Sequence, residues 1–455
     1  MISNLIAVGN LKQAHEYLPH LPSSLRSKFE TKIRDALPLP KGTSKGDDTI
    51  TTQDDYPTWG LAHREIYPWN PHEPDRSSPS CLEEINQHLS TVAPRLEARI
   101  VELPDLISGA PGGRVVKQLG LFAREDLKAG EEVLREKSYL TATARMNDAF
   151  CDGCAVRLPS SALGSSAAAA SEESREEREG AVSCSDCETI FCSQDCLDTA
   201  SELYHPALCD GDFDSLGKDA EAKDAPHALY ALLLLRALAM AKHQEVHPLT
   251  LPQTKYLWGD FLPHSSSSKP SLPFNIHYNI ILPLTMMEKM DINIFEATTE
   301  EGGMGVWVLN TLYAKFRGTA DARMGLDGKP EIGAVHPMWC LANHDCAPNV
   351  GWRWEGDMRF YVRSEEQSVD WRPGTQENSE AEEDSEEEGE EEGEVEVGRG
   401  IRKDEQILGH YCDVELPVKE RREWARGALG GDCMCERCCW EAANPEMVRS
   451  VRIAR

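Results

Sequence analysis

The spacing of apolar residues predicts helices at the start and in the middle of the chain. Segments 1–18 and 23–37 carry apolar side chains at helical spacing, and serines at the start of the second predict an N-cap. Helical spacing also dominates from Ala225 to about Ala320. Its most apolar window, residues 228–241, is interrupted by Arg236 and is shorter than the roughly 20 residues of a membrane span. That window therefore predicts a buried helix.

The spacing changes to strand alternation after a helix predicted over residues 81–92. The segment LEARIVEL (96–103) alternates apolar and polar residues. The segment 120–140 predicts strand, turn and strand, with the turn at 128–130. Two later stretches, MRFYVR (358–363) and IRKDEQILGHY (401–411), predict a strand pair. Predicted strands thus flank the helical middle of the chain.

Length and charge narrow the class of protein. A chain of 455 residues predicts two or three domains, and 40% hydrophobic residues suffice for a core. The net charge of -30 argues against nucleic acid as the main partner and favours a basic one. Sixteen acidic residues and one arginine between Glu365 and Glu396 supply half of that charge. This composition predicts a disordered, dispensable loop over 366–395, and the low-complexity segment 160–180 predicts a second flexible insertion.

The first residues of the sequence do not have the pattern of a signal peptide. No basic N-terminal segment leads into an apolar run, so neither a signal peptide nor a membrane anchor is expected. We expect the protein in the nucleus, the cytoplasm or both. In such a reducing compartment, the fifteen cysteines favour metal binding over disulfides.

Eight possible metal ligands lie in one short block of the sequence. They form four closely spaced pairs: Cys151-x2-Cys154, Cys184-x2-Cys187, Cys192-x3-Cys196 and His205-x3-Cys209. A tight turn aims both side chains of such a pair at one ion. Zinc takes four thiolate or imidazole ligands in a tetrahedron, so eight ligands predict two zinc ions.

A third cysteine group lies near the C-terminus and is incomplete. Cys433, Cys435 and Cys438 supply three thiolates, and the natural fourth donor is Cys346 in LANHDCAPNV. Cys439 adjoins this group and could compete for the fourth position. The spacing therefore predicts a third zinc that ties a polar loop to the end of the chain. The other cysteines are expected to be ordinary core or surface thiols: Cys81, Cys340, Cys412 and Cys439.

Taken in order, these motifs resemble the SET-and-MYND family of protein lysine methyltransferases. The block 151–209 resembles a MYND zinc finger, and GLFAREDLKAGEEVL (120–134) resembles the N-terminal hairpin of a SET domain. The segments NHDCAPN, GHYCDVELPVKERRE and CMCERC resemble the asparagine-histidine motif, the segment of the family's tyrosine and the post-SET cysteines. The resemblance covers roughly residues 95–440 and leaves the first ~90 residues outside.

The resemblance implies an α+β fold with a β-rich SET domain, an inserted MYND zinc finger, a post-SET zinc site and a helical N-terminal extension. The implied segments are the N-terminal extension 1–94, the first part of the SET domain 95–150, the finger 151–209, a helical insert 210–335, the second SET part 336–425 with an acidic insertion 364–396, and the post-SET segment and tail 426–455.

The resemblance also implies the reaction, S-adenosylmethionine-dependent methylation of a lysine amine on a histone or another basic protein. Asn343 and His344 would contact the cofactor, Gly120, Leu121 and Phe122 would supply backbone contacts, and Tyr411 would be both cofactor-contacting and catalytic. The finger would also bind peptide partners. In family terms, the three zinc ions take Cys151, Cys154, Cys192 and Cys196; Cys184, Cys187, His205 and Cys209; and Cys346, Cys433, Cys435 and Cys438.

Two other functions are compatible with parts of the sequence. The chain departs from the family pattern at Gln118, Asp345 and Ala314, which permits a catalytically inactive zinc-binding interaction scaffold. A cross-braced, ubiquitin-ligase-like zinc adaptor is the other alternative, but it leaves NHDCAPN and GHYCD unexplained. His336 and His410 are expected to be structural.

Overall fold

A computed structural model describes most of the chain and divides it into two compact units. The first unit holds residues 1–73 and 139–335, and the second holds 74–138 and 336–455. The described residues are 1–37, 56–64, 70–106, 115–143, 150–158, 180–213, 216, 224–259, 262–263, 270–295, 303–325, 330–369, 371 and 400–447. The two predicted flexible segments, 160–180 and 366–395, fall almost wholly outside these ranges, so their predictions remain untested.

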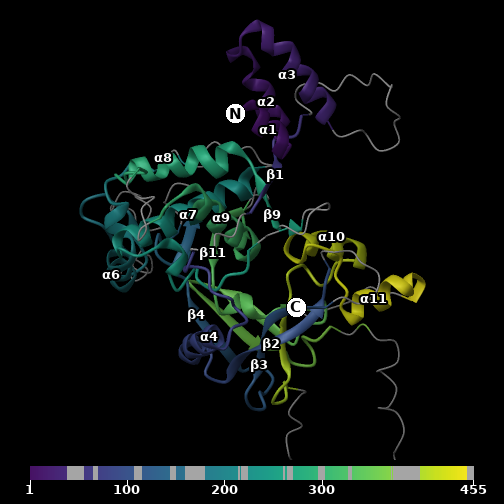
Figure 1. Cartoon of the computed structure of the whole chain (residues 1–455). Coiled ribbons are helices and arrows are strands. Elements are labelled where there is room, and N and C mark those ends of the chain that lie inside the picture. Colours follow the sequence, from purple (N-terminus) through teal and green to yellow (C-terminus); the bar gives the residue numbers. More distant parts are fainter. Residues whose placement is uncertain are drawn as a thin grey trace, which may run out of the picture. The chain divides into compact units, whose positions relative to one another are not determined.

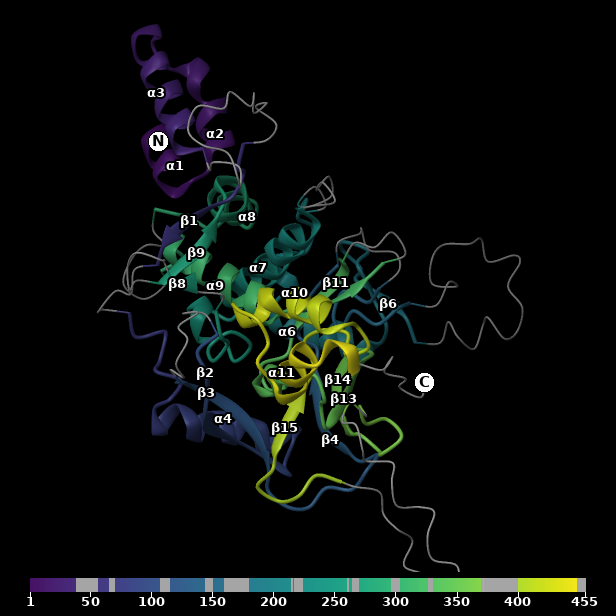
Figure 2. The same ribbon diagram turned by 90° about the vertical axis from the view of Figure 1, so that its right-hand side faces the viewer.

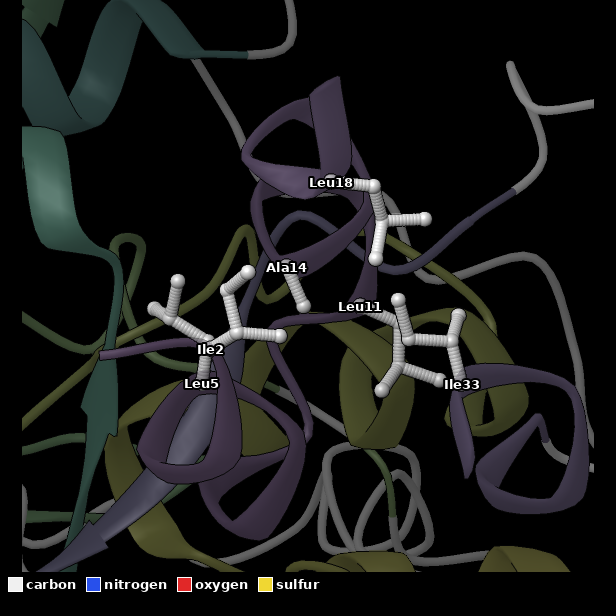
Figure 3. Packing of buried hydrophobic residues seen from close by; sticks show 6 residues of the cluster. All are labelled: Ile2, Leu5, Leu11, Ala14, Leu18 and Ile33. Atoms are coloured by element: carbon white, nitrogen blue, oxygen red, sulfur yellow. The ribbon is translucent and has the colours of Figure 1, made fainter. Parts of the chain in front are cut away.

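The first unit begins with three short helices that share a small core. They are α1 (Ile2–Val8), α2 (Leu11–Glu16) and α3 (Ser23–Ala36), with a 3-10 turn at Leu18–His20 between the last two. Figure 3 shows the buried side chains of this core meeting from all three helices and from the 3-10 turn: Ile2, Leu5, Leu11, Ala14, Leu18 and Ile33.

Two details of the predicted N-terminal helices differ from the structure. The first predicted helix is broken in two because Gly9 adopts a left-handed φ of 85° and ends α1. The predicted serine cap is wrong, since Pro22 precedes α3 and no side chain caps that helix.

The predicted buried helix is α7 (Ala225–His243), which is buried on almost every side. It packs on a three-stranded sheet of β10 (Asp321–Met324), β11 (Pro330–Val335) and β5 (Leu140–Thr143) (Figure 1). The approach is close: a Cβ at Gly333 would lie 2.8 Å from the Leu229 side chain. None of the helices in the described ranges combines the length and apolarity needed to cross a membrane.

The rest of the first unit mixes helices with short strands. The helices are α8 (Leu282–Lys289) and α9 (Val306–Thr319), with a π-helical turn at His277–Ile281 and a 3-10 turn at Pro248–Thr250. A second sheet has the order β1 (Gly60–His63), β9 (Pro270–Phe274), β8 (Leu262–Pro263). The helical region predicted over 225–320 therefore also contains strands. The cysteine-rich block folds as the pair β6 (Val182–Ser183) and β7 (Ile190–Phe191), then α6 (Gln194–Leu203) and a 3-10 turn at His205–Ala207.

The second unit is built on a sheet of order β12 (Asn343–His344), β15 (Gln406–Gly409), β3 (Val115–Ala123), β2 (Leu96–Pro104). The helix α4 (Pro79–Val92) lies along β2 (Figure 1). Its Asn86 side chain donates to the Ala98 carbonyl at 3.0 Å and accepts from the Ala98 N–H at 2.8 Å. This side chain therefore satisfies the backbone of Ala98 on the side of β2 where no strand of the described ranges pairs.

A second sheet in this unit has the order β13 (Val350–Trp354), β14 (Asp357–Val362), β4 (Glu132–Lys137), which can be followed in Figure 2. The predicted pairing of 358–363 with 401–411 is wrong, because β14 pairs with β13 and β4 whereas β15 pairs with β12 and β3. The turn at 128–130 is present, and Gly130 takes a left-handed φ of 81° there. The strands on either side of it, however, belong to different sheets.

The C-terminal part of the second unit is helical. α10 (Val418–Leu429) ends at Gly430, whose φ of 71° suits a left-handed cap, and α11 (Glu436–Ala443) precedes a 3-10 turn at Pro445–Met447. A further 3-10 turn, Trp339–Leu341, leads into β12. The chain is thus a mixed fold of helices and several small sheets.

Candidate functional site

Four cysteines of the block 151–209 bring their sulfurs together in the first unit. The ligand atoms of Cys151, Cys154, Cys192 and Cys196 all lie within 4.8 Å of one another. The Sγ atoms of Cys154 and Cys192 are 3.7 Å apart, and those of Cys192 and Cys196 are 3.5 Å apart. Tetrahedral zinc with Zn–S bonds of about 2.3 Å requires sulfurs about 3.8 Å apart, whereas a disulfide requires about 2 Å. The donor set therefore fits a zinc ion.

The other four ligands of the block form a second set. Cys184, Cys187, His205 and Cys209 also lie within 4.8 Å of one another. The Sγ atoms of Cys184 and Cys209 are 3.8 Å apart, and Cys187 Sγ lies 3.5 Å from His205 Nε2. The backbone N–H of Asp186 and the imidazole of His205 lower the pKa of the Cys184 thiol to about 6. Both groupings are the ones that the resemblance implied.

Arg236, the charged residue inside the apolar helix α7, bonds to the cysteine-rich block 151–209. Arg236 is buried and donates to the Asp152 carbonyl at 3.0 Å and to its carboxylate at 2.9 Å. Its guanidinium lies 3.7 Å from the centre of the Tyr204 ring, and the Tyr204 hydroxyl also donates to the Asp152 carboxylate at 2.7 Å. Asp152 follows a ligand cysteine and Tyr204 precedes the ligand His205. The ion pair between Arg236 and Asp152, together with Tyr204, thus connects both ligand sets to α7.

The third cysteine group is complete in the second unit. Cys346, Cys433, Cys435 and Cys438 have their sulfurs within 4.8 Å of one another. Cys346 Sγ lies 3.4 Å from that of Cys438 and 3.9 Å from that of Cys433. The structure therefore brings together the four residues that the sequence predicts for a third zinc site, from segments 87 positions apart.

Buried charges surround this third group. Arg421 donates to the Cys438 sulfur at 3.5 Å and to the Glu441 carboxylate at 2.6 Å. Arg437 bonds the same carboxylate at 2.7 Å and the Cys346 carbonyl at 2.6 Å. Two arginines and one glutamate leave one positive charge beside the sulfurs, which would offset part of the net negative charge of a four-thiolate zinc centre. These arginines had no recognisable signal in the sequence.

Cys412, expected to be an ordinary core or surface thiol, is a buried thiol that lies beside the third cysteine group. It is buried in the same cluster, and its sulfur lies within 4.8 Å of Cys346 Sγ and of a ring nitrogen of His344. A second group of possible ligands, His344, Cys346 and Cys412, therefore shares Cys346 with the four-cysteine group.

The segment that contains Cys346 is hydrogen-bonded to β15 on both sides of that cysteine. β12 runs parallel to β15, with Asn343 opposite Leu408 and His344 opposite Gly409. Beyond β12, the Asn349 side chain accepts from the Leu408 N–H and donates to the Gln406 carbonyl, each at 2.8 Å. One amide side chain thus continues the ladder as a strand would. This role of Asn349 was not predicted from the sequence.

Tyr411 lies two residues beyond the end of β15, and both its hydroxyl and its backbone N–H form hydrogen bonds. Its hydroxyl donates to the Ala342 carbonyl at 2.8 Å, and its backbone N–H donates to His344 Nδ1 at 3.0 Å. Burial raises the pKa of Tyr411 above its usual value, although the Arg76 guanidinium acts in the opposite direction. The hydroxyl therefore stays protonated at neutral pH.

The predicted backbone contacts on β3 lie beside the same strand. Asn343 Nδ2 donates to the Leu119 carbonyl at 3.0 Å. A Cβ at Gly120 would lie 2.9 Å from Asn343 Nδ2 and 2.8 Å from Gln406 Nε2, so only glycine leaves room for both amides. Within the described residues, Gln406 Nε2 is buried without a hydrogen-bond partner. Leu121 is fully buried and Phe122 half-buried, and they pair with Ile407 and Gln406.

The two histidines expected to be structural are buried or half-buried among other side chains. His336 Nε2 lies 2.8 Å from the Ser138 hydroxyl, and burial lowers the pKa of His336 to about 3. His410 stacks on Trp352 with ring centres 5.7 Å apart, and its Nδ1 lies 3.2 Å from the Cys412 carbonyl.

Comparison with known proteins adds no relative: no protein-family model matches the chain, and no curated protein matches it in sequence.

Proposed function

We propose that the chain is an S-adenosylmethionine-dependent protein-lysine methyltransferase of the SET-and-MYND type. The observation that supports it most is the meeting of three distant motifs at one point. Asn343 contacts the β3 backbone beside Gly120, and the next residue, His344, contacts the backbone of Tyr411. The resemblance assigns cofactor contact or catalysis to each of these residues.

The polar groups beside Gly120 suit a ligand with polar edges. Gln406 Nε2 is a buried donor whose partner is missing from the described residues, and Asn343 Nδ2 lies on the same side of Gly120, because each would be within 3 Å of a Cβ at that position. A buried donor without a partner costs about 1–3 kcal/mol, so a bound acceptor there is favoured. When bound, S-adenosylmethionine supplies an electrophilic methyl group. Asn343, Gln406 and the Gly120 backbone would hold it.

The role of Tyr411 follows from its hydrogen bonds. Because its O–H donates to the Ala342 carbonyl, the lone pairs of its oxygen are free to accept. A neutral lysine amine carries two N–H groups, and its lone pair must face the methyl carbon about 3 Å away. By accepting an amine N–H, the Tyr411 oxygen orients that lone pair. The raised pKa of Tyr411 makes it a poor base at neutral pH, so its work is orientation.

The substrate class follows from charge. A free lysine is almost fully protonated at pH 7, and burial favours its neutral form. The net charge of -30 attracts basic proteins, including histones, at low salt. The three cysteine groups could hold zinc, and we propose one ion in each.

The test combines a binding and a transfer measurement. S-adenosylmethionine binding is measured by calorimetry, and tritium transfer is measured on histones and other basic proteins. Tyr411→Phe is expected to bind the cofactor within a few-fold of wild type and to lose on the order of 10²-fold or more in transfer rate. Tyr361→Phe is the matched control, because it also removes one hydroxyl, bonded to Glu132 at 3.2 Å in the same unit.

Two outcomes contradict the proposal. Equal transfer by Tyr411→Phe and wild type removes the catalytic role of Tyr411. Absence of cofactor binding by wild type would contradict the proposed methyltransferase activity and would favour the inactive zinc-binding scaffold.

A further inference from the structure

The imidazole of His344 contacts two groups of the second unit. Its Nδ1 lies 3.0 Å from the backbone nitrogen of Tyr411, and its Nε2 lies 3.3 Å from the sulfur of Cys346. The rings of His344 and Tyr411 are 5.2 Å apart and tilted by 33°. One end of the imidazole thus faces the candidate catalytic tyrosine and the other faces the third cysteine group.

These contacts determine where the imidazole carries its proton. A backbone N–H can only donate, so Nδ1 must offer its lone pair to Tyr411. A neutral imidazole then carries its proton on Nε2. That N–H points at Cys346 Sγ, and 3.3 Å is a suitable distance for donation to a thiolate.

The same argument excludes His344 as a metal ligand in its neutral form. A metal at Nε2 would need the lone pair of that atom while Nδ1 already uses its own, which leaves only an imidazolate. The group of His344, Cys346 and Cys412 is therefore not an independent metal site, although its atoms lie within 4.8 Å of one another.

We infer that His344 is a positioning residue that connects the four-cysteine metal centre to the backbone of Tyr411. Residues 342 and 344 hold the hydroxyl and the N–H of Tyr411, and Cys346 is two positions further along. A metal that fixes Cys346 thereby fixes the two acceptors that orient Tyr411, the Ala342 carbonyl and His344 Nδ1. The catalytic consequence rests on the proposed function, whereas the hydrogen bond to sulfur does not.

Two substitutions separate the two ends of the imidazole. Asparagine places an amide group near the position of Nδ1, so His344→Asn keeps the acceptor for Tyr411 and removes the donor to sulfur. Glutamine places an amide group near the position of Nε2, so His344→Gln keeps the donor and removes the acceptor. His410→Asn is the matched control, since its Nδ1 faces the Cys412 carbonyl and its ring stacks on Trp352.

The first readout is independent of methyl transfer. The full chain is loaded with cobalt, and metal affinity and the sulfur-to-cobalt charge-transfer bands are measured. Loss of a contact to a ligand typically weakens metal binding about 10–100-fold. We expect that loss, with shifted bands, for His344→Asn, and near-wild-type values for His344→Gln and His410→Asn. Unchanged affinity and bands in His344→Asn would overturn the inference. A lost ligand in both His344 variants would also overturn it, because it would make His344 a ligand.

The second readout is the split between kcat and KM. His344→Gln is expected to lower kcat on the order of 10-fold, because Tyr411 loses its backbone partner. KM for S-adenosylmethionine should change less than kcat, since the substitution leaves the backbone of residue 344 in place for contact with the cofactor. Unchanged kcat in His344→Gln would overturn the positioning role. If wild type transfers no methyl group, the proposed function fails while the cobalt measurement still decides the bond between His344 and Cys346.

Discussion

The block 151–209 and the C-terminal cysteine group are two ways of building a site that could hold a metal ion. In the block, all eight ligands come from 59 consecutive positions, and most are partly exposed. In the C-terminal group, Cys346 joins three cysteines that follow it by 87 to 92 positions, and three of the four ligands are buried. The first arrangement organises a local segment, whereas the second links two distant segments of the second unit.

This difference predicts a difference in stability. Cross-linking distant positions removes more conformational freedom from the unfolded chain than cross-linking near ones. The C-terminal centre also carries its compensating charge with it, since Arg421 contacts both the Cys438 sulfur and Glu441. We therefore expect the second unit to depend on its metal more strongly than the first unit does.

The largest expected effect is the loss of a ligand at the C-terminal centre. Cys433→Ser should lower the free energy of unfolding by several kcal/mol, because the binding energy of structural zinc is folding energy. Cys187→Ser should cost less, since the cross-link that it removes is local. Thermal unfolding with and without a chelator measures both.

The control for this comparison is Cys439→Ser, which removes an exposed thiol next to Cys438. It should leave unfolding unchanged. If Cys433→Ser and Cys187→Ser unfold alike, the distinction between local and distant centres is wrong.

A smaller effect is expected from the charges behind the C-terminal centre. Arg421→Met removes a buried partner of Glu441 and the donor to Cys438. Breaking a buried pair from one side typically costs about 3–5 kcal/mol, and the remaining Arg437 should keep the loss near the lower end. Arg426→Met on the same helix breaks an exposed pair with Asp432 and should cost less than about 1 kcal/mol. Urea unfolding of both variants checks the difference, and equal losses would contradict it.

The two centres also differ in how far the sequence predicted them. The pairs in the block are readable because a ligand two or three positions away shares one tight turn. The prediction that Cys346 joins Cys433, Cys435 and Cys438 agrees with the structure, which places the four sulfurs within 4.8 Å of one another. Arg421, Asn349 and Cys412 carried no such signal, because their partners lie 17 to 68 positions away and only folding brings them together.

Strand pairing shows the same limit. Alternation identified β14 and β15 as strands, but it reports which faces are buried and not which strand lies alongside. The helix over 228–241 was predictable from composition, whereas the reason for Arg236 within it became visible only with Asp152 and Tyr204 around it. The sequence predicted much of the local conformation, but it did not predict which distant residues would come into contact.

The most direct test of the account is the number of zinc ions bound by the full chain. The account predicts three per chain for wild type, two in the block 151–209 and one at the C-terminal centre. Cys346→Ser should then bind two, because it removes the ligand that joins the polar loop to the C-terminus, while Cys439→Ser should still bind three. Two ions in wild type, or three in Cys346→Ser, would contradict the claim that a metal ties these distant segments together.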